Sequence, residues 1–92
     1  MIVSFRDEDT RKLAAGIRVV RFIAFESTAR RKLRQLEIAG NLEDLKIPSG
    51  NRLEKLRGDR SGVFSIRINH RWRICFEWTA AGAKDVEIVD YH

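Results

Sequence analysis

The feature that most constrains the fold of this chain is a series of short runs beyond residue 51 in which apolar and polar residues alternate. The runs read RLEKLR, FSIRIN, WRICFEW and VEIVDY, and they are separated by GDRSG, HR and TAAGAKD. A period of two places successive side chains on opposite faces of a strand. The separating segments are rich in turn-forming residues and too short for crossovers, so we predict an antiparallel meander.

The N-terminal half has a different pattern. IVSF is a short candidate strand, and Asp7, Asp9 and Thr10 are candidate N-caps for a first helix through RKLAAG. A second helix is predicted from about Val19 to a C-cap at Gly40. Its apolar face is formed by residues spaced three or four apart: Phe22, Phe25, Ala29, Leu33 and Leu36. We therefore expect an α+β fold, with two N-terminal helices packed on one face of a mainly antiparallel sheet of four to five strands.

The length and composition indicate one domain over residues 1–92. A chain of 92 residues with 43% hydrophobic and 34% charged residues is globular in composition and too short for a second core. Cys75 is the only cysteine, so no disulfide forms within the chain and a reducing compartment is expected. No stretch approaches the roughly 20 apolar residues that span a bilayer, and no targeting segment is recognised. We expect a soluble, cytoplasmic protein with no membrane association.

The charge balance gives the first indication of a partner. Eighteen Lys and Arg residues against thirteen Asp and Glu give a net charge of +5, mostly from arginine, whose planar fork suits phosphate. Such a charge favours either RNA binding or simple solubility. The second helix carries a run of basic residues, Arg30, Arg31, Lys32 and Arg34. This basic face is expected to be solvated, with an RNA backbone or an acidic partner as the alternative.

The period of two also sorts the side chains of the central strands. Phe64, Ile66 and Ile68 in one run, and Trp72, Ile74, Phe76 and Trp78 in the next, are expected to face the helices. Arg67 and Arg73 then project from the uncovered face of neighbouring strands. Two functions are open for this pair. The arginines either share an anion-binding surface or only form weak surface ion pairs with Glu77, Glu87 or Asp59.

The run VEIVDYH ends on three side chains that can transfer protons, namely those of Asp90, Tyr91 and His92. RNA cleavage without a metal needs a base for the 2′-hydroxyl, cations for the charge on phosphorus, and an acid for the leaving oxygen. Histidine, with an ordinary pKa of about 6.5, suits either proton-transfer role, and arginine suits the cationic one. His70 and His92 lack metal-ligand spacing, and His70 is expected in a turn. We predict no metal and no cofactor.

The run NRLEKLRGDRSGVFSIRINHRWRICFEW, followed by VEIVDYH, resembles the HigB toxins of the RelE superfamily, and the similarity includes MIVSF at the start. The resemblance implies a RelE-like fold and a toxin that cleaves mRNA in the A site of the 70S ribosome, where it also contacts rRNA, and so stops translation and growth. It implies a HigA-type helix-turn-helix antitoxin as well. Operator DNA is then bound only through the toxin–antitoxin complex.

The same resemblance assigns roles to individual residues. It gives Arg67 and Arg73 contacts to the phosphate and the transition state, and it gives Asp90, Tyr91 and His92 to the active site and mRNA. Either Asp90 or His92 is the general base, and Tyr91 is expected to stack on a nucleobase. Further RNA contacts are predicted for Lys55, Arg57, Arg60 and Arg71. Where some relatives have a histidine and a lysine, this chain has Glu54 and Arg57.

Two alternatives remain on the same fold. ParE-like toxins share the fold but inhibit DNA gyrase and cleave no RNA, which would make this chain an interaction protein and not an enzyme. A non-catalytic RNA-binding module would hold phosphates with the same arginines, and its affinity would fall steeply with salt. Fold similarity by itself does not separate these functions.

Overall fold

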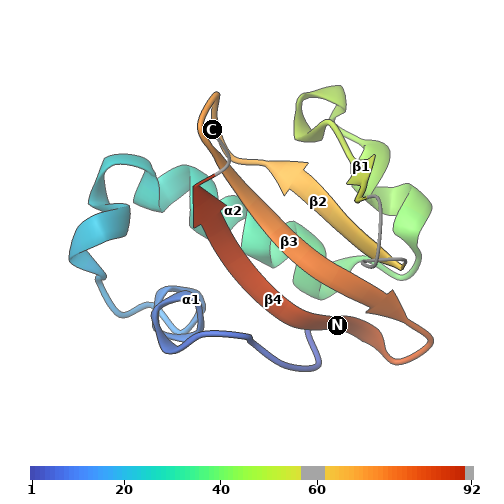
Figure 1. Ribbon diagram of the computed structural model, residues 1–92, viewed down its shortest axis with the longest axis horizontal. Helices are drawn as coiled ribbons and strands as arrows, with labels where there is room; N and C mark the ends of the chain where they lie inside the picture. Colours follow the sequence, from blue (N-terminus) through green and yellow to red (C-terminus); the bar gives the residue numbers. More distant parts are fainter. Residues whose placement is uncertain (57–61, 91–92) are drawn as a thin grey trace.

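The computed structural model describes residues 1–56 and 62–90 (Figure 1). Two α-helices, α1 (Glu8–Ala14) and α2 (Glu26–Ile38), are accompanied by three 3₁₀ helices: η1 (Val20–Phe25), η2 (Leu42–Lys46) and η3 (Ser49–Asn51). The strands are β1 (Glu54–Lys55), β2 (Val63–Arg67), β3 (Trp72–Thr79) and β4 (Gly82–Asp90). They form one sheet in the order β1-β2-β3-β4, with every pair antiparallel. The predicted α+β class and the antiparallel meander are confirmed.

The N-terminal segment lies beside β4 without forming a full strand. Isolated parallel bridges join Ile2 to Ala83 and Phe5 to Val86, and the Val3 amide donates to the Ala83 carbonyl over 2.6 Å. The candidate strand IVSF is therefore present only as two isolated bridges to β4. Among the described residues the sheet has four strands.

Both predicted helices are present, and the structure refines their bounds. Of the three candidate N-caps of α1, Asp7 takes the role, since its carboxylate accepts from the Thr10 amide (3.0 Å) and hydroxyl (2.7 Å). The segment predicted as one helix from Val19 is instead a 3₁₀ helix followed by α2. Residues three apart lie on one side of a 3₁₀ helix, which directs Phe22 and Phe25 together into the core.

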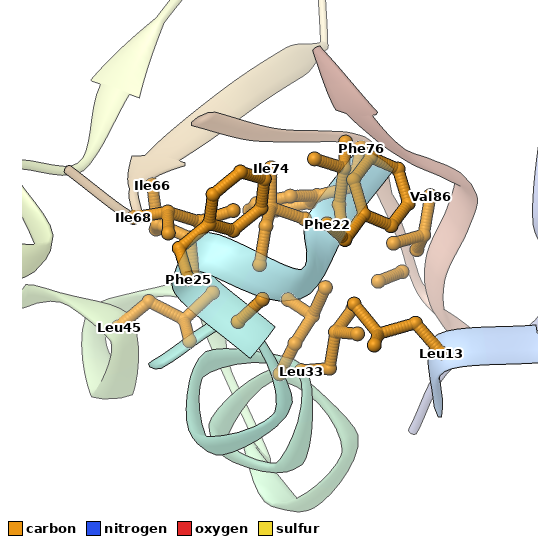
Figure 2. Close-up of a cluster of buried hydrophobic side chains, with 14 of the residues drawn as sticks. Leu13, Phe22, Phe25, Leu33, Leu45, Ile66, Ile68, Ile74, Phe76 and Val86 are labelled. Carbon is orange, nitrogen blue, oxygen red and sulfur yellow. The ribbon is translucent and has the colours of Figure 1, made fainter. Parts of the chain in front are cut away.

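The core lies between the helices and one face of the sheet (Figure 2). Figure 1 shows α2 behind the sheet and α1 beside β4. Apolar residues of α1, η1 and α2 meet those of β2, β3 and β4, as the two periodicities predicted. The buried side chains include Leu13, Phe22, Phe25, Ala29, Leu33, Leu36, Ile66, Ile74, Phe76, Val86 and Ile88. None of the helices within residues 1–56 and 62–90 is long and apolar enough to cross a membrane.

The last strand is longer than predicted. The segment TAAGAKD was interpreted as a loop, but β4 already begins at Gly82, after a turn at residues 80–81. A bulge explains why the alternation was hidden, since Cys75 pairs with Glu87 whereas Glu77 pairs with Lys84. Within this shift Asp85 has a left-handed backbone, with a φ of 53°. The bulge changes the register in the first half of β4.

The face of the sheet that lies away from the helices is not uniformly exposed. Ser65 and Cys75 are fully or almost fully buried there, and Arg73 is only 8% exposed. The expectation that Arg73 projects from an uncovered face is therefore wrong. Its guanidinium group lies along β2 and meets the segment that precedes β1, as the hydrogen bonds below describe.

Candidate functional site

The candidate site is built around two arginines on neighbouring strands. Arg67, the last residue of β2, is the direct register partner of Arg73 in β3. Directly opposed side chains of an antiparallel pair lie on the same face, and like charges in this arrangement destabilise a sheet. No carboxylate among the described residues forms an ion pair with Arg67. The pair therefore creates a positive surface that an anion would stabilise.

Arg73 is held rigidly by hydrogen bonds. Its Nε donates to the Ser65 hydroxyl over 2.8 Å, and its Nη2 donates to the backbone carbonyl of Arg52 over 2.6 Å. A longer contact of 3.3 Å joins Nη2 to the Ser65 carbonyl, and the Glu54 carboxylate lies 3.9 Å from the same nitrogen. A guanidinium fixed in this way presents its charge at one position without further reorganisation.

A hollow of about 400 Å³ lies over these side chains. Its lining contains four arginines and a single carboxylate, which gives it a strongly positive character. The lining residues are Arg52, Glu54, Arg67, Asn69, His70, Arg71 and Arg73. The predicted meeting of Arg67 and Arg73 on one concave surface is found here. Such a hollow suits a phosphate group, because planar guanidinium groups bind phosphate oxygens in pairs.

The hairpin between β2 and β3 contributes residues that the sequence prediction did not include in the site. The Asn69 side-chain oxygen accepts from the amides of Arg71 (2.9 Å) and Trp72 (2.8 Å), which fixes the turn. His70 lies in this turn, as predicted, but it also lines the hollow. The signal was present in the sequence, because His70 stands between two predicted site arginines on a connection of four residues.

Asp90 reaches the same end of the sheet from the other face. It is the register partner of Trp72, whose ring packs on Phe22 and Phe25 of the core at centroid distances of 5.9 Å and 5.0 Å. Its carboxylate accepts from Arg71 Nε (2.9 Å) and Nη2 (2.6 Å). This hydrogen bond raises the pKa of Arg71. Asp90 therefore binds an arginine of the hollow without lining it.

The other predicted site residues are distributed unevenly. Lys55 is exposed in β1 and pairs with Phe64, so its side chain starts from the helix side of the sheet and does not line the hollow. Arg71 lines the hollow, with its guanidinium 5.7 Å from the ring centroid of Trp72. Four predicted residues lie outside the described ones: Arg57, Arg60, Tyr91 and His92.

The basic run on α2 forms the predicted solvated face only in part, because Arg31 and Arg34 are exposed but the other two residues are not. Lys32 is only 6% exposed, and its ammonium group donates to the side-chain oxygen of Asn51. Burial lowers the pKa of Lys32, and the nearby charge of Arg31 lowers it further. Arg30 is tied to the core as well, because its Nε donates to the Leu13 carbonyl over 3.2 Å. Lys32 and Arg30 therefore have mainly structural contacts.

A second, larger hollow of about 730 Å³ lies between the N-terminal segment, α1 and α2. Apolar side chains such as Phe5, Leu33 and Ile38 contribute to its lining, together with Arg11 and Arg34. None of the predicted site residues that the structure describes lines it. No group of three or more metal-ligating side chains occurs in the part of the chain that the structure describes.

The fold and the site together define a class of small α+β proteins in which helices cover one face of an antiparallel sheet and arginines gather on the other. A family model described as "RelE-like toxin of type II toxin-antitoxin system HigB" matches residues 4–92. The chain therefore belongs to the HigB-like toxin family.

Two curated relatives are similar over shorter stretches. The chain is 44% identical over 55 residues to Toxin HigB-1 of Vibrio cholerae serotype O1, which covers 60% of this chain and 58% of the relative. It is 39% identical over 41 residues to Endoribonuclease HigB of Proteus vulgaris, which covers 45% of each protein. The matched stretches thus span about half the length of these relatives.

Proposed function

We propose that this chain is a toxin of a type II toxin–antitoxin system that cleaves mRNA during translation, in the A site of the ribosome. Membership of the HigB-like family and the name of the Proteus vulgaris relative, an endoribonuclease, support this proposal. The observation that carries it is the direct register pairing of Arg67 and Arg73 in one positive hollow. Two directly opposed arginines do not stabilise a sheet surface that only contacts water, whereas a phosphodiester bound at this position neutralises their charges.

The reaction that we propose is cleavage by the neighbouring 2′-hydroxyl, without a metal. A base removes the 2′-hydroxyl proton, the oxygen attacks phosphorus, and the 5′-oxygen leaves with a proton from an acid. Arg73, fixed by Ser65 and the Arg52 carbonyl, stabilises the charge that develops on the phosphorus oxygens. Arg67 holds the same phosphate from the opposite strand.

Proton transfer is proposed for the residues at the end of β4. His92 and Asp90 are the candidates for general base and acid, and Tyr91 for stacking on a base of the mRNA. Because Asp90 binds Arg71, its second role is to orient that arginine toward the RNA. His70 is an additional candidate for proton transfer, since it lines the hollow beside Arg71. Arg57, Arg60 and Arg71 are proposed to contact RNA phosphates around the hollow, and Lys55 to contact them at the exposed edge strand β1.

The partners proposed for the chain follow from the same assignment. They are mRNA and rRNA in the 70S ribosome, and a HigA-type helix-turn-helix antitoxin that neutralises the toxin. Through the antitoxin the complex would bind the operator DNA. Such partners require a cytoplasmic location.

Primer extension on a defined mRNA tests the function. Purified protein is added either to the naked RNA or to ribosomes that carry the same message. We expect cuts only within codons of the ribosome-bound RNA. Equal cleavage of naked RNA would contradict the ribosome dependence, and intact RNA in both samples would favour gyrase inhibition. His92→Ala and His70→Ala, measured side by side, then identify which histidine transfers a proton.

A further inference from the structure

A buried polar cluster lies behind the site, outside the groups assigned to the reaction. Asn51, the last residue of η3, has no solvent exposure. Its side-chain nitrogen donates to the Gln35 side chain and to the Leu45 carbonyl, both over 3.1 Å. Its side-chain oxygen accepts from the Lys32 ammonium group. One amide thus joins the loop before β1 to η2 and α2, with each of its polar atoms in use.

Lys32 is a destabilising residue at this position. It is 6% exposed, and no carboxylate among the described residues lies within ion-pair distance. Burying a cation that is compensated only by an amide oxygen destabilises the folded state. A leucine or methionine would fill the same space at lower cost. Because Lys32 does not contribute stability, we look for its contribution in the orientation that it imposes on the Asn51 side chain.

That geometry continues directly into the candidate site. Arg52, the next residue, has a left-handed backbone with a φ of 44°, which is uncommon for a residue with a side chain. This conformation accompanies the 2.6 Å hydrogen bond from Arg73 Nη2 to the Arg52 carbonyl. The position of that carbonyl depends on Asn51, because the hydrogen bonds of the buried Asn51 side chain fix the backbone directly before Arg52.

We propose that Lys32 and Asn51 are positioning residues for Arg73. They hold the Arg52 carbonyl where it orients the Arg73 guanidinium toward the reacting phosphate, and they do not touch the RNA. The proposal rests on the proposed function, since it assigns a role within the same reaction. It predicts that loss of either residue mainly slows the chemical step.

A double-mutant cycle tests the proposal. Single-turnover cleavage of ribosome-bound mRNA is measured for the wild type, Asn51→Ala, Arg73→Ala and the double variant. We expect Asn51→Ala to lower the maximal rate by on the order of 10-fold to 100-fold. The concentration for half-maximal rate should change little, because Arg67 and Arg71 remain in the hollow. If Asn51 acts through Arg73, the double variant should match Arg73→Ala within roughly two-fold.

Matched controls separate positioning from stability. Thr10 is as deeply buried as Asn51, but its hydroxyl joins the N-cap of α1 to the Ile88 amide of β4 and makes no hydrogen bond to the segment before β1 that holds Arg73. Thr10→Val should therefore lower the free energy of unfolding but leave the cleavage rate per folded molecule unchanged. Circular dichroism determines the folded fraction. Lys32→Met should behave like Asn51→Ala, whereas Lys32→Gln, which keeps a donor, should retain more activity. If Asn51→Ala does not fold, the two Lys32 variants carry the same test.

Two results would overturn the proposal. In the first, the double variant is slower than Arg73→Ala by the full effect of Asn51→Ala, so the two residues act independently. In the second, Asn51→Ala cleaves as fast as Thr10→Val, so burial alone explains the effect. An inactive wild type would instead count against the proposed function. In that case the Nε–H signal of Arg73 in ¹⁵N NMR still decides the positioning. It should be protected from exchange in the wild type and Thr10→Val, and lose that protection in Asn51→Ala.

Discussion

The two faces of the sheet are built from alternate residues of the same strands, yet they are buried in different ways. On the helix face, Ile66 and Ile74 are fully buried among apolar side chains. On the other face, Ser65 and Arg73 are buried just as completely or nearly so, but by directed hydrogen bonds. Burial on the helix face depends on how well the side chains fill the available volume. Burial on the other face depends on the angles and partners of the hydrogen bonds. A substitution should therefore affect stability on one face and the presentation of charge on the other.

The largest effect on stability is expected from the helix face. Ile74→Ala should lower the free energy of unfolding by about 2–5 kcal/mol, because it removes buried apolar volume and leaves a cavity. Urea denaturation followed by fluorescence measures this change. Cleavage by the remaining folded protein should be normal. A loss below about 1 kcal/mol would mean that the core collapses around the cavity, and the contrast between the faces would disappear.

The neighbouring residue on the opposite face should show the reverse behaviour. Arg73→Ala should lower single-turnover cleavage by about 10²-fold or more, since it removes a fixed charge beside the developing oxyanion. Arg73→Lys should not restore the rate, because an ammonium group cannot replace the fork that joins Ser65 to the Arg52 carbonyl. An unchanged rate in Arg73→Ala would remove Arg73 from the reaction, and a full rate in Arg73→Lys would show that its charge suffices without the fork.

The repulsion between Arg67 and Arg73 predicts a smaller, ligand-dependent effect. Inorganic phosphate at about ten times its dissociation constant should stabilise the fold by about 1.4 kcal/mol. For a domain of this size that corresponds to an increase in Tm on the order of 4–8 °C per kcal/mol. Differential scanning fluorimetry measures it, with sodium chloride at equal ionic strength as the control. Arg67→Ala should abolish the difference, and equal shifts in both salts would argue against a site.

The smallest effect concerns Lys32 and pH. Its folded pKa lies below the ordinary value of 10.5, so the unfolded chain binds the proton more tightly. Stability contributed by this residue should therefore rise as pH increases from the lowered folded pKa toward 10.5. Lys32→Met should remove this rise. The difference between the two denaturation curves across alkaline pH isolates the residue from other groups, and parallel curves would contradict the lowered pKa.

The sequence predicted well what depends on local periodicity. Alternation identified β2, β3 and the end of β4, and it assigned Ile66, Ile74 and Phe76 to the core. It also brought Arg67 and Arg73 to one surface. These predictions succeed because the direction of a side chain along a strand follows from the backbone alone.

What the sequence missed depends on contacts between distant segments. The burial of Arg73 needs the segment before β1, which is held by Lys32 from α2. The hydrogen bonds from Arg71 to Asp90 need the pairing of Asp90 with Trp72, which brings the end of β4 beside the turn before β3. Lys55 was assigned to the RNA surface from its neighbours in the chain, but its pairing with Phe64 directs it to the other side. Periodicity contains no information on such pairings.

Cys75 has a practical consequence. It is the only cysteine of the chain, and at 2% exposure it lies between Ser65 of β2 and Glu87 of β4. A thiol reagent reaches it only when neighbouring strands separate. The rate of labelling by such a reagent therefore measures how often the sheet opens, without an engineered probe. The protein contains its own reporter of breathing motions, positioned two residues from the arginine proposed to stabilise the transition state.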